Sequence, residues 1–372
     1  SLVSQLETMT TTTMSNLPKY MVEGILSRVP FKYMRSAMLL TCKNWNALFR
    51  SKCFAKMILE KEEEAARELG ETRMVVMMIH NVYLMGITIN ENPSTRFLGK
   101  LTYGSEQVKI YQVFHCEGLL LCILKEDDTK ILVWNPYLGQ TRWIQTSDET
   151  RGYKILRFID ELCHFNLKYN VLRYEIYDFD TDLWTTLSLN PDWRIVSHCG
   201  ITLKGNTYWC ANERNAYRLS DHIICFDFTR ERFGSLLPLP FKAWGSHSPS
   251  LSLVREENIA ALFQTSQSSN VEIWITTKID VTNVSWSNFF TVNMIAFGKK
   301  LLRMSFLIDE DKKVAMVFGK DIRILQNTMH IIGESGCLRI FEIGQLANKN
   351  CWPRVCSYVP SIVQIKQHIQ SS

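Results

Sequence analysis

The amino-acid sequence predicts a multidomain α + all-β protein, in which a small N-terminal helical module precedes a β-propeller-like domain of about six blades. Three observations predict this architecture. Apolar residues recur at helical spacing before Gly70, and short β-type runs replace them after it. A pattern of aromatic residues and polar turns then recurs at intervals of 43 to 49 residues. The 372 residues suffice for both parts.

The helical module is predicted from spacing, caps and breakers. Asn16 can cap a first helix, Pro18 suits its first turn, and Pro30 ends it. A second helical run extends from Tyr33 to Trp45, and Met57 to Leu69 reads as a charged connecting helix. We therefore expect a disordered segment over 1–15, the module over 16–55, a linker over 56–71, the β domain over 72–365 and a tail over 366–372.

The β domain is predicted from runs of Val, Ile, Tyr, Phe and Trp between Gly, Asn, Asp and Pro turns. No convincing helix occurs between Thr72 and Gly344. Its repeat is an aromatic residue, a polar turn and a second aromatic residue, and such a period is typical of propeller blades. Asn or Asp side chains are expected to bond the turn backbone. The repeat pairs are Trp134 with Trp143, Tyr177 with Trp184, Phe226 with Phe233, and Trp274 with Trp286.

Composition excludes several function classes. The net charge of +5 comes with charges of both signs and no basic stripe, so nucleic acid is not an expected partner. The longest apolar stretch, Met74 to Ile89, is interrupted and too short for a membrane span, and Ser1 to Met14 lacks a signal pattern. We expect a cytoplasmic or nuclear protein. The eleven cysteines include no C-x-x-C pair, so neither a metal nor a cofactor is expected.

No known catalytic motif is present. Glu161 with His164, or Asp180 with Asp182, are conceivable acid/base pairs, but such carboxylates mostly occupy turn contexts. The sequence therefore favours a non-enzymatic role over a propeller hydrolase.

The helical module resembles the F-box family. The matching positions are Leu17-Pro18, Ile25-Leu26, Arg28-Val29-Pro30, Cys42-Lys43 and Trp45. The stretch from Pro30 to Trp45 is one residue longer than the usual pattern. The resemblance implies that this module binds a Skp1-like adaptor and, through it, a cullin. The adaptor-binding residues would be Leu17, Pro18, Ile25, Leu26, Val29, Pro30 and Trp45.

The β domain resembles the plant F-box-associated domain of type 1, which is of the kelch-like propeller type. The resemblance lies in an ordered set of motifs, and it implies a substrate receptor of an SCF-type E3 ubiquitin ligase that presents an unknown target protein. The motifs are HCEGLLLC (115–122), VWNP (133–136), YEIYDF (174–179), LKGNTYW (203–209), CFDFTRERF (225–233), LPLP (237–240), EIWITTKI (272–279) and IIGESG (331–336).

Target contacts are expected on the turns of one propeller face, over 212–218, 244–247 and 264–270. The candidate residues are Arg214, Trp244, His247 and Gln267. The alternative is an F-box protein whose β domain binds a sugar or another small molecule through aromatic and amide side chains at the propeller mouth. The tryptophans are expected to be mostly buried between blades instead.

Overall fold

The computed structural model describes the β domain and the helix before it. Apart from Met21, the predicted module up to residue 50 lies outside the described residues, and with it all seven predicted adaptor-binding residues. Within the described part of the chain, no helix is both long and apolar enough to cross a membrane. The described residues are 21, 51–78, 80–90, 92–101, 109–125, 130–138, 140–144, 154–161, 171–181, 183–196, 200–214, 222–241, 249–264, 270–293, 305–321, 326–343, 353–363 and 365.

Helix α6 (Lys52–Glu68) leads into the β domain. The Ser51 hydroxyl caps it by accepting a hydrogen bond from the Phe54 N–H at 3.4 Å, and Gly70 follows its end with a left-handed φ of 59°. Buried Phe54 and Ile58 lie one turn apart on one face. The predicted helix over Met57 to Leu69 is therefore present, and it begins five residues earlier, at Lys52, because Ser51 provides the cap.

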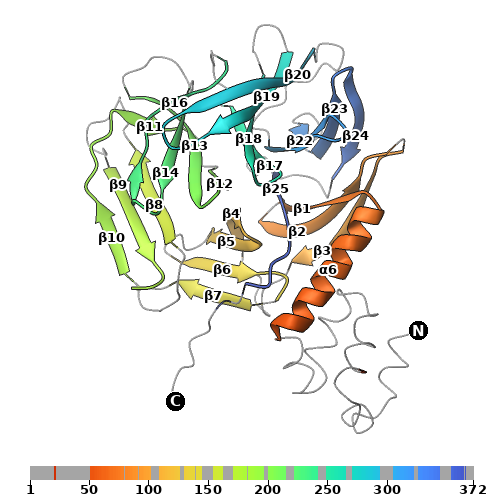
Figure 1. Cartoon of the computed structure of the whole chain (residues 1–372), viewed down its shortest axis with the longest axis horizontal. Coiled ribbons are helices and arrows are strands. Elements are labelled where there is room, and N and C mark those ends of the chain that lie inside the picture. The colour runs from red at the N-terminus through yellow and green to blue at the C-terminus, as the bar shows by residue number, and fades with distance from the viewer. Residues whose placement is uncertain are drawn as a thin grey trace.

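The described strands form six antiparallel sheets arranged as blades around an axis (Figure 1). This confirms the predicted propeller. The ring closes because β25 near the C-terminus pairs with β1, so blade 1 joins the two ends of the domain. As expected from the sequence, the described residues between Thr72 and Ile343 contain no helix.

Each blade is a meander whose strands run from the axis outward. Blade 3 shows three described strands, and residues 145–153 before them are outside the described set. The strands are, for blade 1, β25 (Arg354–Ser357), β1 (Glu71–Met78), β2 (Asn81–Thr88) and β3 (Ser94–Leu101); for blade 2, β4 (Ile110–Cys116), β5 (Leu119–Leu124), β6 (Ile131–Asn135) and β7 (Gln140–Ile144); for blade 3, β8 (Lys154–Glu161), β9 (Val171–Asp178) and β10 (Leu183–Leu187); for blade 4, β11 (Trp193–Ile195), β12 (Ile201–Leu203), β13 (Asn206–Glu213), β14 (His222–Asp227), β15 (Arg232–Phe233) and β16 (Leu237–Pro238); for blade 5, β17 (Ser250–Val254), β18 (Asn258–Gln264), β19 (Asn270–Ile279) and β20 (Val284–Asn293); for blade 6, β21 (Ser305–Asp309), β22 (Val314–Asp321), β23 (Gln326–Gly333) and β24 (Gly336–Glu342).

The sequence repeat falls on the hairpin that leads into the outermost strand of a blade. Asn135, Asp178 and Asp227 end the strands next to the outermost ones in blades 2, 3 and 4. Each side chain accepts hydrogen bonds from the following turn, at 3.0 Å from the Leu138 N–H, 2.7 Å from the Asp180 N–H, and 2.9 and 3.0 Å from the Thr229 and Arg230 N–H groups, respectively. These bonds lower the pKa of Asp227, with the Arg230 N–H as the main cause. The predicted role of these turn residues is confirmed.

Six clusters of buried apolar residues lie between neighbouring blades, one at each of the six interfaces among the described residues. A blade cannot cover its own two faces, so its stability comes from this stacking. Trp134 and Trp209 are buried in such clusters, as predicted. Trp184, Trp274 and Trp286 are less deeply buried, because they pack on the margins of their clusters. None of the five is exposed, so the prediction that they are mostly buried is confirmed.

The last described segment, Tyr358 to Ile365, runs from blade 1 past blade 2 to blade 3, and we call it the C-terminal strap. The amide of Asn135 donates to the Ser361 carbonyl at 2.9 Å and the Val363 carbonyl at 2.7 Å. The Ile365 N–H donates to the Gln140 side-chain oxygen at 2.7 Å. At Gly118, an added Cβ would lie 2.2 Å from Ser361, so glycine is required for this close approach. The strap thereby holds three blades together.

Candidate functional site

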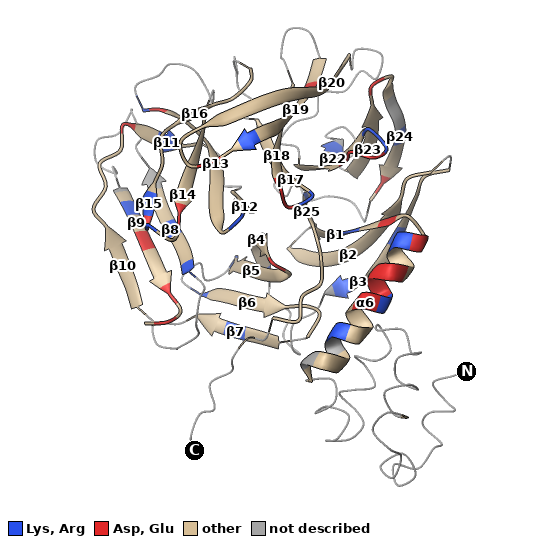
Figure 2. Cartoon of the chain, in the orientation of Figure 1, with Lys and Arg blue, Asp and Glu red and all other residues tan. Residues whose placement is uncertain are grey.

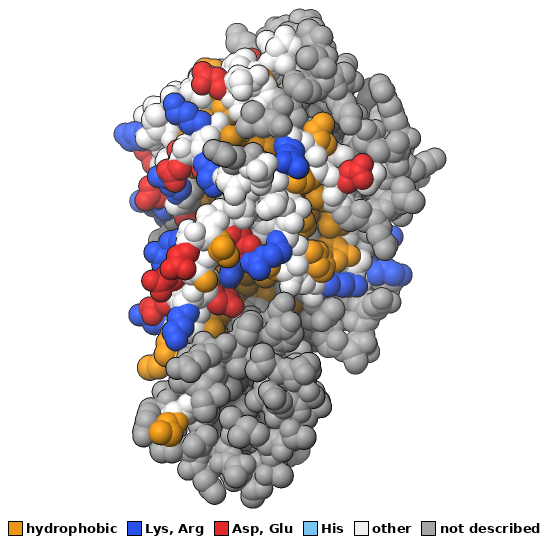
Figure 3. All heavy atoms as spheres, turned by 90° about the vertical axis from the view of Figure 1, so that its right-hand side faces the viewer, with side chains coloured by type: hydrophobic (Ala, Val, Ile, Leu, Met, Phe, Trp, Pro, Cys, Tyr) orange, Lys and Arg blue, Asp and Glu red, His pale blue; other side chains and the backbone are white. Residues whose placement is uncertain are grey.

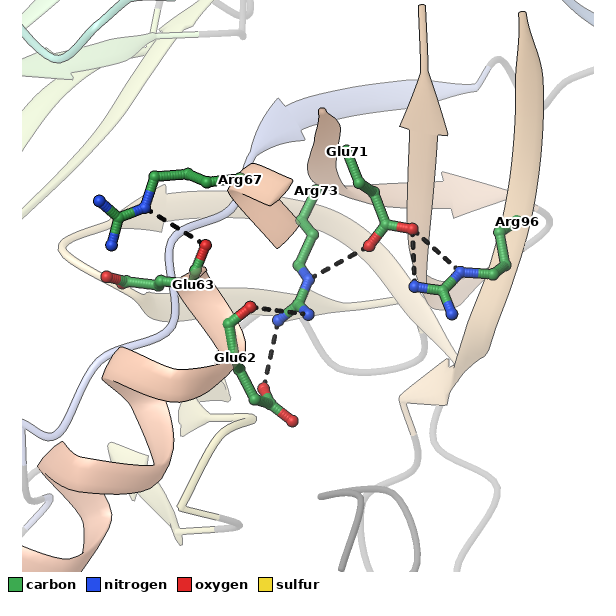
Figure 4. Close-up of polar contacts among 6 residues, drawn as sticks. All are labelled: Glu62, Glu63, Arg67, Glu71, Arg73 and Arg96. Atoms are coloured by element: carbon green, nitrogen blue, oxygen red, sulfur yellow. Dashed lines mark hydrogen bonds and ion pairs between the residues drawn. The ribbon is translucent and has the colours of Figure 1, made fainter. Parts of the chain in front are cut away.

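The junction between α6 and the propeller is built from four residues of alternating charge on three elements. Glu62 comes from α6, Glu71 and Arg73 from β1, and Arg96 from β3 (Figure 4). The Arg73 guanidinium contacts the Glu62 carboxylate at 3.2 Å, the Glu62 carbonyl at 3.4 Å and the Glu71 carboxylate at 3.5 Å. Arg96 donates two bonds to the other oxygen of Glu71, at 2.9 and 2.7 Å. This network fastens the helix to blade 1.

Glu71 is the central group of this junction. Its side chain is only 4% exposed, and it forms ion pairs with the two arginines that flank it. Strand β2 makes room for it at Gly86, which pairs with Arg73 on one side and Arg96 on the other. A Cβ added at Gly86 would lie 2.5 Å from the Glu71 carboxylate. The absence of a side chain at position 86 is therefore what allows the carboxylate to lie between its partners.

Helix α6 also approaches blade 2. Burial raises the pKa of Tyr137, in the turn before β7, and the nearby charge of Glu62 raises it further. Buried Tyr137 therefore lies beside the same helical carboxylate that contacts Arg73. Figure 2 shows acidic and basic residues at intervals along α6, while Phe54 and Ile58 are buried. The helix is thus held to blade 1 by polar contacts, and Tyr137 of blade 2 lies close enough to Glu62 to feel its charge.

The predicted target segments can be placed by the strands that flank them. Because strands alternate in direction, connections from second to third strands, and from one blade to the next, leave the propeller on one face. We call this the loop face, and the opposite side the turn face. The strands that precede the three predicted segments (212–218, 244–247 and 264–270) are β13, β16 and β18, and their C-terminal ends lie on the loop face; residues 215–218, 244–247 and 265–269 themselves lie outside the described residues.

Of the four predicted target-binding residues, the structure describes Arg214. Its side chain donates to the Pro191 carbonyl at 3.1 Å, and its backbone N–H to the Asp192 carbonyl at 2.6 Å. Arg214 is half-buried and ties β13 to the segment before β11, which is a structural role. Trp244, His247 and Gln267 lie outside the described residues, so their binding role stays a prediction.

Sequence reasoning missed the junction residues. The Glu-rich stretch around Glu62 was interpreted as a solvated helix face, and nothing local in the sequence relates it to Arg96, which lies two strands further on. The adjacent charges of Glu71 and Arg73, directly after a helix-ending Gly70, were the only available signal. Among the residues considered as acid/base groups, Asp180 lies in the turn after β9; the side chains of Glu161, His164 and Asp182 are outside the described set.

Comparisons with known proteins match both parts of the chain. A model of the F-box domain matches residues 14–57, and a model of the F-box associated beta propeller domain matches residues 73–365. A putative F-box protein from Arabidopsis thaliana is 57% identical, over 96% of this chain and 93% of its own length. An F-box/kelch-repeat protein from the same plant is 45% identical, over 96% and 90%. A third Arabidopsis protein, named peroxiredoxin-2A, is 56% identical, over 98% of this chain and 70% of its own length.

Proposed function

We propose that this chain, which belongs to the family of F-box proteins with an F-box associated β-propeller domain, is the substrate-recognition subunit of an SCF-type E3 ubiquitin ligase. The F-box would bind a Skp1-like adaptor, and through it a cullin. The propeller would bind a target protein, in the cytoplasm or the nucleus. The order of domains, F-box over 14–57 and propeller over 73–365, supports this division of labour.

The observation that carries the proposal is the polar junction of α6. A receptor of this kind acts by position, because it must hold target lysines near a ubiquitin-charged enzyme bound elsewhere in the complex. A helix joined to the propeller by Glu62, Arg73, Glu71 and Arg96 restricts how the target can swing relative to the F-box. No residue of this chain needs to touch the ubiquitin thioester. The role is therefore that of a non-catalytic receptor.

The name of one relative raises a second candidate, a thiol peroxidase. A peroxide-reactive cysteine needs a lowered pKa and access to solvent. Burial instead raises the pKa of Cys116 and Cys225 to about 11 and that of Cys356 to about 12. These three thiols therefore offer no support for that activity, and part of that relative lies outside the match.

The experiment is affinity purification of the full chain from plant cells in which the proteasome or cullin neddylation is blocked. The comparison is a truncated chain that begins at Ser51, so that the α6 cap is kept. A target should be retained by both chains, and an adaptor and a cullin by the full chain alone. Targets that accumulate with the full chain in the absence of the block, without ubiquitylation, would contradict the proposal.

A further inference from the structure

At the outer rim of the ring, the interface between blades 6 and 1 carries a surface that the packing of the propeller does not use. Blade 1 presents Tyr83 from β2, and Phe97 and Lys100 from the outermost strand β3. Blade 6 presents Arg339 and Phe341 from its outermost strand β24. The register places these side chains on facing sides: Phe97 pairs with Met85, Phe341 pairs with Met329, and both methionines lie in the core cluster between the two blades. We call these five residues the 6–1 seam.

Aromatic rings line this seam. The Phe97 side chain is 58% exposed, and its ring centre lies 5.5 Å from that of Tyr83. On the opposite blade the Arg339 guanidinium lies 5.4 Å from the centre of the Phe341 ring. Tyr83 and Phe341 both pack against the same core cluster, so the seam continues that core to the surface. Figure 3 faces this side of the molecule and shows hydrophobic side chains gathered there beside basic ones.

The charge of the seam has one sign. Among the described residues of the third and outermost strands of both blades, the sides that face this interface carry Lys100 and Arg339 and no carboxylate. Glu342 pairs with Thr328 and so belongs to the other side of its blade. Lys100 is exposed and makes no ion pair among the described residues. A ligand that complements this surface is therefore acidic.

Strand β3 also has an open edge. Among the described strands it pairs with β2 alone, so no described strand occupies the backbone groups of its outer side. An extended peptide can use such an edge through main-chain hydrogen bonds, whereas a nucleic acid or a lipid surface cannot. The combination of an open edge, aromatic rings and the exposed Lys100 cation thus favours a protein segment as the occupant.

We propose that the 6–1 seam binds an extended acidic segment of a partner protein, which adds along the edge of β3 and packs an apolar side chain on Phe97. This inference rests on the proposed function, and it specifies the chemical class of target that the receptor would recognise. The 6–1 seam lies on the outer rim of the ring, away from the loop face. Binding to it should weaken as salt concentration rises, because the cations are exposed.

The test uses a random peptide library somewhat longer than β3, selected on the full chain, and fluorescence anisotropy of the enriched peptides. The double variant Phe97→Ser with Lys100→Glu removes the ring and reverses the charge. Its matched control is Leu183→Ser with Thr185→Glu on β10, another outermost strand whose Leu183 is 63% exposed. We expect enriched peptides to be rich in Asp and Glu, and to bind the seam variant at least about tenfold more weakly while the control binds normally.

Three results would overturn the inference. They are a selection that enriches no peptides, enriched peptides without an excess of Asp and Glu, and enriched peptides that bind the seam variant as tightly as the wild type. In the last case the cations would serve only to protect an open strand edge. Tighter binding of a labelled oligothymidylate or of anionic vesicles at the same residues would overturn it as well. Adaptor binding of both variants is measured separately. Peptide binding without adaptor binding would support the seam as a binding site and contradict the proposed function. Adaptor binding without peptide binding would support the proposed function and contradict the seam.

Discussion

Replacement of Asn135 by Asp tests whether the C-terminal strap closes the propeller. The Asn135 side chain is fully buried, and its amide donates to two strap carbonyls at 2.9 and 2.7 Å. A carboxylate cannot donate, and it would lie buried against both carbonyl oxygens. Two lost bonds cost about 1 kcal/mol each, and the unsatisfied buried groups add to this. We expect N135D to lose roughly 3–5 kcal/mol of unfolding free energy at neutral pH.

The matched control is Gln140→Glu, which introduces the same charge beside the same strap. The Gln140 oxygen accepts the Ile365 N–H, and a carboxylate can still accept it. Urea unfolding followed by tryptophan fluorescence should show a large fall in midpoint for N135D and a small one for Q140E, with similar slopes. The buried carboxyl of N135D should have a raised pKa, so this variant should regain stability as pH falls through that pKa towards the lower pKa of an unfolded Asp. Equal losses in both variants would refute the reasoning.

Three other predictions concern the junction, the core and the turn face. Gly86→Ala should displace Glu71 and cost about 1–3 kcal/mol in thermal unfolding; an unchanged melting temperature would show that the carboxylate relocates freely. Trp134→Ala should cost about 3–5 kcal/mol in urea and Trp286→Ala less than half of that, since Trp134 is 1% exposed and Trp286 half-buried. Burial lowers the pKa of His115 to about 4, below its unfolded value of 6.5, so stability should fall as pH drops from 6.5 towards 4. His115→Gln should flatten that dependence, and a wild-type profile that is already flat would contradict it.

The propeller was predictable because its repeat consists of interactions between residues that are close together in the sequence. Aromatic residues and turn-forming Asn or Asp recur at the hairpins that lead into the outermost strands, and the same local bonds form in blades 2, 3 and 4. The second role of Asn135, its hydrogen bonds to the C-terminal strap, was not predictable. Its partners Ser361 and Val363 lie more than two hundred positions away, and no local pattern marks them. Ring closure brings them together, and closure is a property of the whole domain.

The site was predicted less well than the fold, for a related reason. Charged residues such as Glu62 and Arg96 look like ordinary surface positions, and only the packing of α6 on blade 1 brings them into one network. Arg214 shows the opposite case. It has the type and position of a binding residue, yet its guanidinium bonds the Pro191 carbonyl. Residue type alone does not distinguish a binding arginine from one that braces a strand end.

The measurement that tests the central claim most directly is the affinity of the full chain for a purified Skp1-like adaptor. The comparison is the double variant Leu17→Ala with Pro18→Ala, which leaves the propeller unchanged. Two interface residues at about 2 kcal/mol each correspond to a loss of roughly a thousandfold. We predict micromolar or tighter binding by the wild type, and no detectable binding by a double variant that still unfolds at the wild-type temperature. A wild-type chain that does not bind the adaptor at micromolar concentration would contradict the assignment of this chain as a ligase receptor.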